Sequence, residues 1–143
     1  MMGNSFLGVG AFATLGEQVE SIEADRHSMS ATRKKPSPHP KYSVHNLETN
    51  TSIQIREYVS HAGTVFGIGW NGMSYPDLTQ LLGSFVSDYQ DALKKNPRRQ
   101  GRRHHAVHTN RLVIEKWGHM RNLQGRAYIR SLIPPGVTPD EIN

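Results

Sequence analysis

The clearest pattern in the chain is a run of large apolar residues at steps of three and four. These residues are Leu78, Leu82, Phe85, Tyr89 and Leu93. Such spacing places side chains on one face of an α-helix. Pro76 suits the first helical turn, and Asn96-Pro97 stops the helix. The pattern predicts a long amphipathic helix from about residue 76 to residue 95.

On both sides of this helix, apolar and polar residues alternate, which is typical of half-buried β-strands. The alternation predicts strands at about 42–47, 53–59, 64–70, 112–117 and 125–132. A turn is predicted at Asn50-Thr51. In the third strand, Gly67 and Gly69 leave one face bare, so we expect another segment to pack closely there.

The order of these elements predicts the fold class. Leu15, Val19 and Ile22 fall near helical spacing, which predicts a short helix over about 16–31. A chain of 143 residues is enough for one domain. We therefore predict an α+β fold, with an antiparallel sheet of about five strands, one long amphipathic helix packed on one face, and a short N-terminal helix.

The start of the chain indicates a cellular location. The first thirteen residues carry no charge and end in Ala11-Phe12-Ala13, a small-x-small triplet of the kind that signal peptidase cuts. A basic start and a longer apolar run are missing. We interpret residues 1–13 as a truncated signal-peptide remnant before a domain at 14–143, which predicts a periplasmic or secreted protein. The alternative is an apolar N-terminus of a cytosolic protein.

The net charge of +5 comes mainly from two basic loops, at 33–41 and 94–108. These loops hold ten of the seventeen Lys and Arg residues and no acidic residue. The rest of the chain is acidic, which argues against nucleic acid as a partner. Zero cysteines exclude disulfides and thiol chemistry. No cofactor motif is present, and no apolar run approaches the roughly 18 residues of a membrane-spanning helix.

Several short segments form a combination that is more specific together than singly. They are Arg56-Glu57-Tyr58-Val59-Ser60, Gly63, Val65-Phe66, Trp70, Pro76-Asp77-Leu78, Leu81-Leu82-Gly83, Gly118-His119-Met120-Arg121 and Gly125-Arg126-Ala127-Tyr128. Over about residues 15–137 the chain resembles the bacterial family called domain of unknown function 2844. The resemblance implies a small exported protein with a signal peptide before a Leu-Gly pair, as at Leu15-Gly16. It implies no activity, cofactor or partner.

Glu57 is the first candidate for chemistry. It shares strand parity with Ile53, Ile55 and Val59, so an unbroken strand turns its carboxylate inward. A buried carboxylate is costly unless it is paired or protonated. Glu57 is then a general acid or base. Alternatively it forms a buried ion pair, with Arg121 or Arg126 as partner, or points outward at a bulge.

The histidines offer two further candidates. His119, on the bend before Arg121, is either a base, a ligand or an anion contact, or a turn residue with a satisfied ring. His104, His105 and His108 could bind zinc, copper or nickel. Four arginines beside them oppose a cation, so the second interpretation is a solvated loop with weak metal affinity.

The last strand suggests a binding surface. Arg126, Tyr128 and Arg130 share one face, with Trp117 at matching parity on the neighbouring strand. Ala127 and Ile129 share the other face and fit packing under the helix. We therefore expect an aromatic and basic surface on the side away from the helix, or an ordinary wet sheet face.

Three functions remain open. The first is a non-catalytic binding or accessory module of the bacterial cell envelope, with an envelope protein, a glycan or an anionic surface as partner. The second is a small hydrolase or isomerase that uses Glu57 or His119. The third is a periplasmic metal-binding protein that uses the histidine loop.

Overall fold

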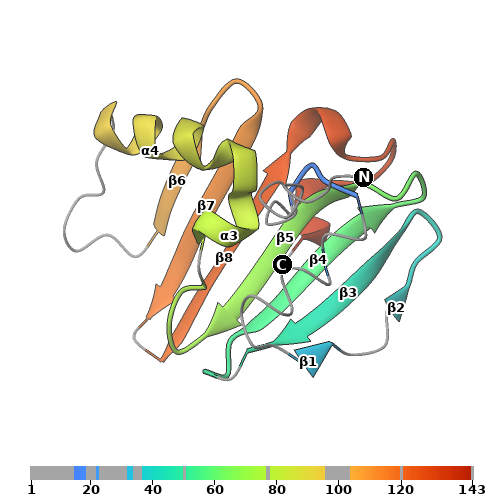
Figure 1. The fold of residues 1–143 in the computed structure, drawn as a ribbon, viewed down its shortest axis with the longest axis horizontal. Helices are drawn as coiled ribbons and strands as arrows, with labels where there is room; N and C mark the ends of the chain where they lie inside the picture. The colour runs from blue at the N-terminus through green and yellow to red at the C-terminus, as the bar shows by residue number, and fades with distance from the viewer. Residues whose placement is uncertain are drawn as a thin grey trace, which may run out of the picture.

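The computed structural model describes residues 15–18, 22, 32–33, 37–49, 51–76, 78–95, 104–119 and 121–142. In these ranges the chain forms an eight-stranded antiparallel sheet (Figure 1). Its strands are β1 (Thr32–Arg33), β2 (Ser37–Pro38), β3 (Tyr42–Glu48), β4 (Gln54–Ser60), β5 (Val65–Gly72), β6 (His104–His108), β7 (Leu112–His119) and β8 (Asn122–Ile129). The order across the sheet is β1-β3-β4-β5-β8-β7-β6, and β2 also pairs with β3.

The prediction of an α+β fold with about five strands and one long helix is wrong, because the described part of the chain is mostly β-sheet and its helices are short. The five predicted strands are present as β3, β4, β5, β7 and β8, and β1, β2 and β6 add to them. The predicted helix is divided into α3 (Leu78–Leu82), the 3-10 turn η1 (Gly83–Phe85) and α4 (Val86–Lys95). Gly83 has a φ of +54°, which an α-helix cannot accommodate. The apolar period continues through the break, because both helices bury the same side of the segment.

Some predicted segments have a different structure or lie outside the described residues. Residues 104–108, expected as the end of a basic loop, form β6 instead. The other expected loop, at 33–41, includes the last residue of β1 and all of β2. The signal remnant at 1–13 and most of the short helix over 16–31 lie outside the described ranges. None of the helices in the described part of the chain is long and apolar enough to cross a membrane.

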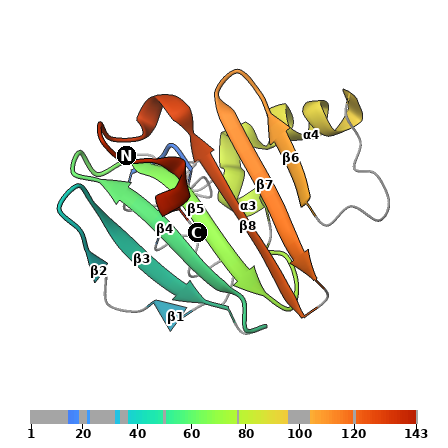
Figure 2. The ribbon, with the colours of Figure 1, turned by 180° about the vertical axis from the view of Figure 1, so that it is seen from behind.

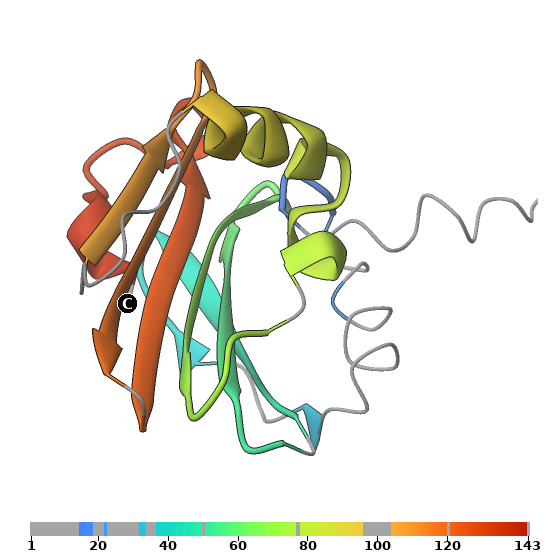
Figure 3. The same cartoon turned by 90° about the vertical axis from the view of Figure 1, so that its left-hand side faces the viewer.

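The inner face of the sheet, defined as the face toward α3 and α4, carries the larger core. Figure 3 shows the helices on one side of the sheet and the segment after β8 on the other. Alternate strand residues such as Ile55, Ile68, Trp70, Ala127 and Ile129 pack with Leu81, Leu82, Phe85 and Tyr89 from the helices. As predicted, Ala127 and Ile129 therefore lie on the side of the helices.

The outer face carries a second core, which is closed by residues 130–142, the C-terminal segment. This segment crosses the outer side of the central strands through η2 (Arg130–Leu132) and η3 (Pro139–Glu141), and it lies in front of them in Figure 2. The second core consists of Tyr42, Tyr58, Phe66, Val113, Tyr128, Val137 and Ile142. Ile142 is fully buried, and a Cβ at Gly67 would lie 2.6 Å from its Cδ1. The expectation that a segment packs closely against the glycine face of the third strand is thus confirmed for Gly67.

Candidate functional site

The aromatic and basic surface predicted on β7 and β8 is partly covered by the C-terminal segment. Arg126 pairs with Glu115, and Tyr128 pairs with Val113, so the predicted parity of β7 and β8 is present. Tyr128, however, is buried in the second core, and burial raises its pKa. The alternation of a strand gives the side on which a residue lies but not what covers that side. Tyr128 is therefore not available as a contact residue.

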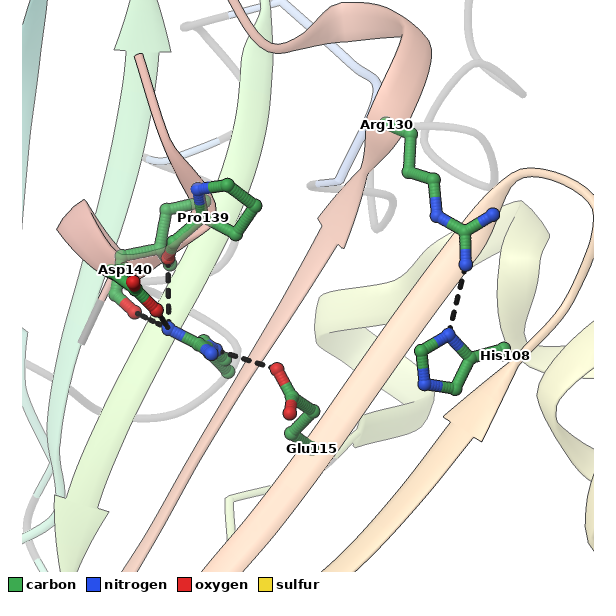
Figure 4. A network of polar contacts seen from close by, with 7 residues as sticks. His108, Glu115, Arg130, Pro139 and Asp140 are labelled. Carbon is green, nitrogen blue, oxygen red and sulfur yellow. Dashed lines mark hydrogen bonds and ion pairs between the residues drawn. The ribbon is translucent and has the colours of Figure 1, made fainter.

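Arg126 anchors the C-terminal segment to the sheet. Its Nε donates to Glu115 Oε1 at 2.8 Å, and its Nη1 donates to the carbonyl oxygens of Pro139 at 2.9 Å and Ile142 at 3.3 Å. Nη1 also lies 3.6 Å from Asp140 Oδ1 (Figure 4). These contacts stabilise the fold because they satisfy backbone carbonyls with a charged donor. These contacts give Arg126 a structural role.

Beyond this anchor, an outer strip of partly or fully exposed residues lies on β6, β7, β8 and the first residue of η2. We define the outer strip as His108, Glu115, Trp117, Arg126 and Arg130. Arg130 and His108 are exposed, and Arg130 Nη2 lies 2.9 Å from His108 Nδ1 (Figure 4). The half-buried Trp117 ring lies 5.7 Å from the guanidinium carbon of Arg126.

The other predicted loop residues lie beside this strip. Arg121 is exposed in the turn after β7, and His119 pairs with Asn122 at the start of β8. His119 is not brought close to Glu57, because β5 and β8 separate their strands. A site that uses both residues is therefore excluded by the strand order.

Glu57 faces inward, as its parity predicted. It is fully buried on the inner face, whereas Arg126 projects from the outer face and Arg121 is exposed in a distant turn. The direct cross-strand partner of Glu57 is His45, which is also buried. The Nε2 atom of His45 lies 3.2 Å from Ser43 Oγ. The inner face of β3 and β4 thus holds a hydroxyl, an imidazole and a carboxylate in sequence.

The three histidines of the metal hypothesis lie on one strand, β6. Successive strand residues point to opposite faces, so His105 and His108 project to different sides of the sheet. Within the described ranges, no three His, Cys, Asp or Glu side chains gather into a group that could hold a metal ion. The strand does not bring this triplet together.

A pocket of about 650 Å³ lies where the β4–β5 turn meets the C-terminal segment. Its lining residues are Pro40, Lys41, Ser60, His61, Ala62, Thr64 and residues 131–135. We call it the end pocket. Its residues come from three separate parts of the chain, so the sequence pattern alone gave no sign of it. A second pocket, of about 470 Å³, lies between α4 and the β6–β7 turn and includes the Arg111–Asp88 ion pair.

A polar cluster next to the end pocket fastens the C-terminal segment to β3. The Tyr42 hydroxyl donates to Glu141 Oε1 at 3.0 Å, and the Thr138 backbone N–H donates to Glu141 Oε2 at 2.9 Å. Burial and this contact with Glu141 raise the pKa of Tyr42 to about 12. The Thr138 N–H, with a smaller effect of Tyr42, lowers the pKa of Glu141. His39 stacks on Tyr42 with ring centres 4.0 Å apart.

Family comparison covers nearly the whole chain. A family model described as a protein of unknown function (DUF2844) matches residues 11–142. The chain belongs to the DUF2844 family. This confirms the resemblance noted in the sequence, and the match spans every described strand and helix of this DUF2844 domain. No curated protein and no solved structure matches the chain.

Several residues that carry the resemblance hold the fold of the DUF2844 domain together. Gly125 lies directly under the Trp70 ring, where a Cβ would overlap the indole. Gly118 has a φ of +107°, and its hypothetical Cβ would clash with the Asn122 carbonyl in the β7–β8 hairpin. Arg126 is the anchor described above. The pattern therefore marks packing positions more clearly than a ligand site.

Proposed function

We propose that this DUF2844 domain is a non-catalytic binding module of the bacterial cell envelope, and that it binds an acidic partner protein through the outer strip. The observation that carries the proposal is the division of the outer face. The C-terminal segment buries Tyr128 but leaves Trp117 half-buried and His108 exposed on the sheet, and the first residue of the segment, Arg130, is exposed beside His108.

The chemistry of the outer strip supports an acidic partner. Glu115 balances Arg126 at 2.8 Å, so the guanidinium of Arg130, which donates to His108 Nδ1, supplies the remaining positive charge of the strip. Aromatic and arginine side chains are the residues most often responsible for binding energy at protein interfaces. Trp117 and Arg130 are the expected anchors, and Arg126 contributes by orienting the Trp117 ring.

A capture experiment with matched variants tests this function. The domain is immobilised as wild type, Trp117→Ala, Arg130→Ala and Met73→Ala, and is incubated with envelope extract at low and high salt. Met73 is exposed and lies outside the strip, so it is the control. We expect one acidic protein that wild type and the control retain, that both strip variants lose, and that salt releases. Equal recovery by all four proteins, or no specific protein at all, refutes the proposal.

Export is tested separately. In an N-terminally extended version with a complete signal peptide, we expect cleavage after Ala13, because only there does a small-x-small triplet follow an apolar run. N-terminal sequencing of the periplasmic fraction checks it. An uncut product in the cytosol contradicts the envelope location.

One observation favours the enzyme alternative. The Ser43 hydroxyl lies 3.2 Å from His45 Nε2, the arrangement of a nucleophile beside a base, and Glu57 is the cross-strand neighbour of His45. A hydrolase of this kind would react with a fluorophosphonate at Ser43 and lose the reaction in Ser43→Ala and His45→Gln. Labelling with this pattern replaces the binding proposal with a catalytic one, and an unreactive Ser43 removes the alternative.

A further inference from the structure

The end pocket is separate from the outer strip and has a distinct chemical character. Its volume of about 650 Å³ falls within the roughly 300–1,000 Å³ typical of small-molecule sites. Its apolar walls come from prolines and from Ala62, Leu132 and Ile133. Its polar residues are three hydroxyls and two basic side chains, and none of the described residues that line it is acidic. Apolar walls with a few convergent donors suit a ligand with an apolar body and one anionic group.

The hydroxyls of the pocket are prepared to donate. Ser60 Oγ accepts the Thr64 backbone N–H at 3.4 Å, and Thr64 Oγ1 accepts Gln18 Nε2 at 3.4 Å. Because each oxygen already accepts one hydrogen bond, its own proton is left to donate to a ligand oxygen. Ser131, which is exposed, adds a third hydroxyl from the C-terminal segment.

The position of Lys41 is set by the C-terminal segment. Gly136 has a φ of +84°, and a Cβ there would overlap Lys41 Nζ, so the lysine crosses directly over this turn. The turn is closed by the Val137 N–H, which donates to the Pro134 carbonyl at 3.1 Å. Lys41 also lowers the pKa of Glu141, but that carboxylate is already held by Thr138 and Tyr42. The ammonium group is thus placed beside the pocket without a dedicated ion-pair partner in its lining.

We infer that the end pocket binds a small carboxylate with a compact apolar body. Lys41 and His61 attract the carboxylate, the hydroxyls of Ser60 and Thr64 orient it, and the wall from Leu132 to Pro135 receives the apolar body. An anion without an apolar part would leave this wall in contact with water, and a neutral ligand would leave the basic side chains unused.

Backbone amide NMR titration with benzoate tests this inference. Benzamide has the same shape without the charge, and inorganic phosphate has charge without the apolar body. We expect benzoate to shift the amides of residues 60–64 and 131–133 saturably. We expect benzamide and phosphate to bind at least about tenfold more weakly, the factor that corresponds to one lost charge-assisted contact.

Substitutions locate the binding. Lys41→Met and Ala62→Asp should each weaken benzoate about tenfold, the first by removing the cation and the second by adding a repelling carboxylate. Lys94→Met, at the exposed end of α4, is the control and should leave binding within about twofold. Equal binding of benzoate and benzamide, equal binding of phosphate, shifts centred elsewhere, or no saturation by about 20 mM benzoate each overturn the inference.

Discussion

Gly67 and Ile142 form a packing pair whose energy can be measured by a double-mutant cycle. Ile142 is fully buried, so Ile142→Ala should reduce the free energy of unfolding by about 2–5 kcal/mol. Gly67→Ala places a methyl group 2.6 Å from Ile142 Cδ1 and should cost about 1–3 kcal/mol through overpacking. In the double variant the new methyl group at residue 67 occupies space that the Ile142 side chain filled in the wild type. The overpacking cost of Gly67→Ala should therefore largely disappear.

The expected coupling between the two sites is therefore about 1–3 kcal/mol. Urea unfolding followed by tryptophan fluorescence measures it, because the chain has two tryptophans, of which Trp70 is buried. Met73→Ala removes a large apolar side chain from an exposed position and should change stability by less than about 0.5 kcal/mol. Additive effects of Gly67→Ala and Ile142→Ala would show that the C-terminal segment does not pack on β5, and would contradict the packing of the second core described above.

Three further predictions concern single sites. Arg126→Met should cost about 1.5–3 kcal/mol in urea unfolding, because the carbonyls of the C-terminal segment lose a charged donor, and a cost below 0.5 kcal/mol would contradict the anchoring role. Tyr42 has its pKa raised to about 12 from 10, so its contribution is complete below pH 10 and is lost as the pH rises towards 12. A urea midpoint that falls equally with pH in wild type and Tyr42→Phe would be inconsistent with this. Leu82→Ala should cost about 2–5 kcal/mol, since Leu82 is fully buried on the side of α3 that faces the sheet, and a loss below about 0.5 kcal/mol would mean that the buried face of α3 is wrongly assigned.

The five main strands could be predicted from sequence, because apolar and polar residues alternate along them. The break between α3 and α4 and the additional strands β1, β2 and β6 could not be predicted in this way. The spacing of apolar residues gives no sign of the helix break at Gly83, where φ is positive. The apolar residues on either side of Gly83 are buried against the same face of the sheet, so their spacing is that of a continuous helix. β6 has a single buried apolar residue, Val107, among histidines, so its sequence carries no strand pattern. Charge suggested a loop there, but pairing with β7 determined the structure.

For the candidate sites, too, local features could be predicted from the sequence, whereas contacts between distant segments could not. Parity correctly placed Glu57 inward and Arg126 outward, because alternation depends on local geometry alone. Tyr128 is covered by the C-terminal segment, which contains Pro134-Pro135-Gly136 and has no regular spacing of apolar residues. The only sign of this cover in the sequence was the bare glycine face of the third predicted strand. His45 is found only from the register of β3 with β4, and the end pocket only from the meeting of three distant segments.

The second core also limits the order in which parts of the chain can fold. The hydrogen bond from Tyr42 to Glu141 joins residues 99 positions apart, and β5 reaches its neighbour β8 only after the helices and β7 have been made. Contacts this distant in sequence are slow to form, because the entropy of closing a long loop is lost before they stabilise the structure. Until residues 137–142 arrive, Tyr58 and Phe66 stay exposed on a nascent hairpin. During synthesis this hairpin therefore carries unburied aromatic side chains until the segment that covers them has been made.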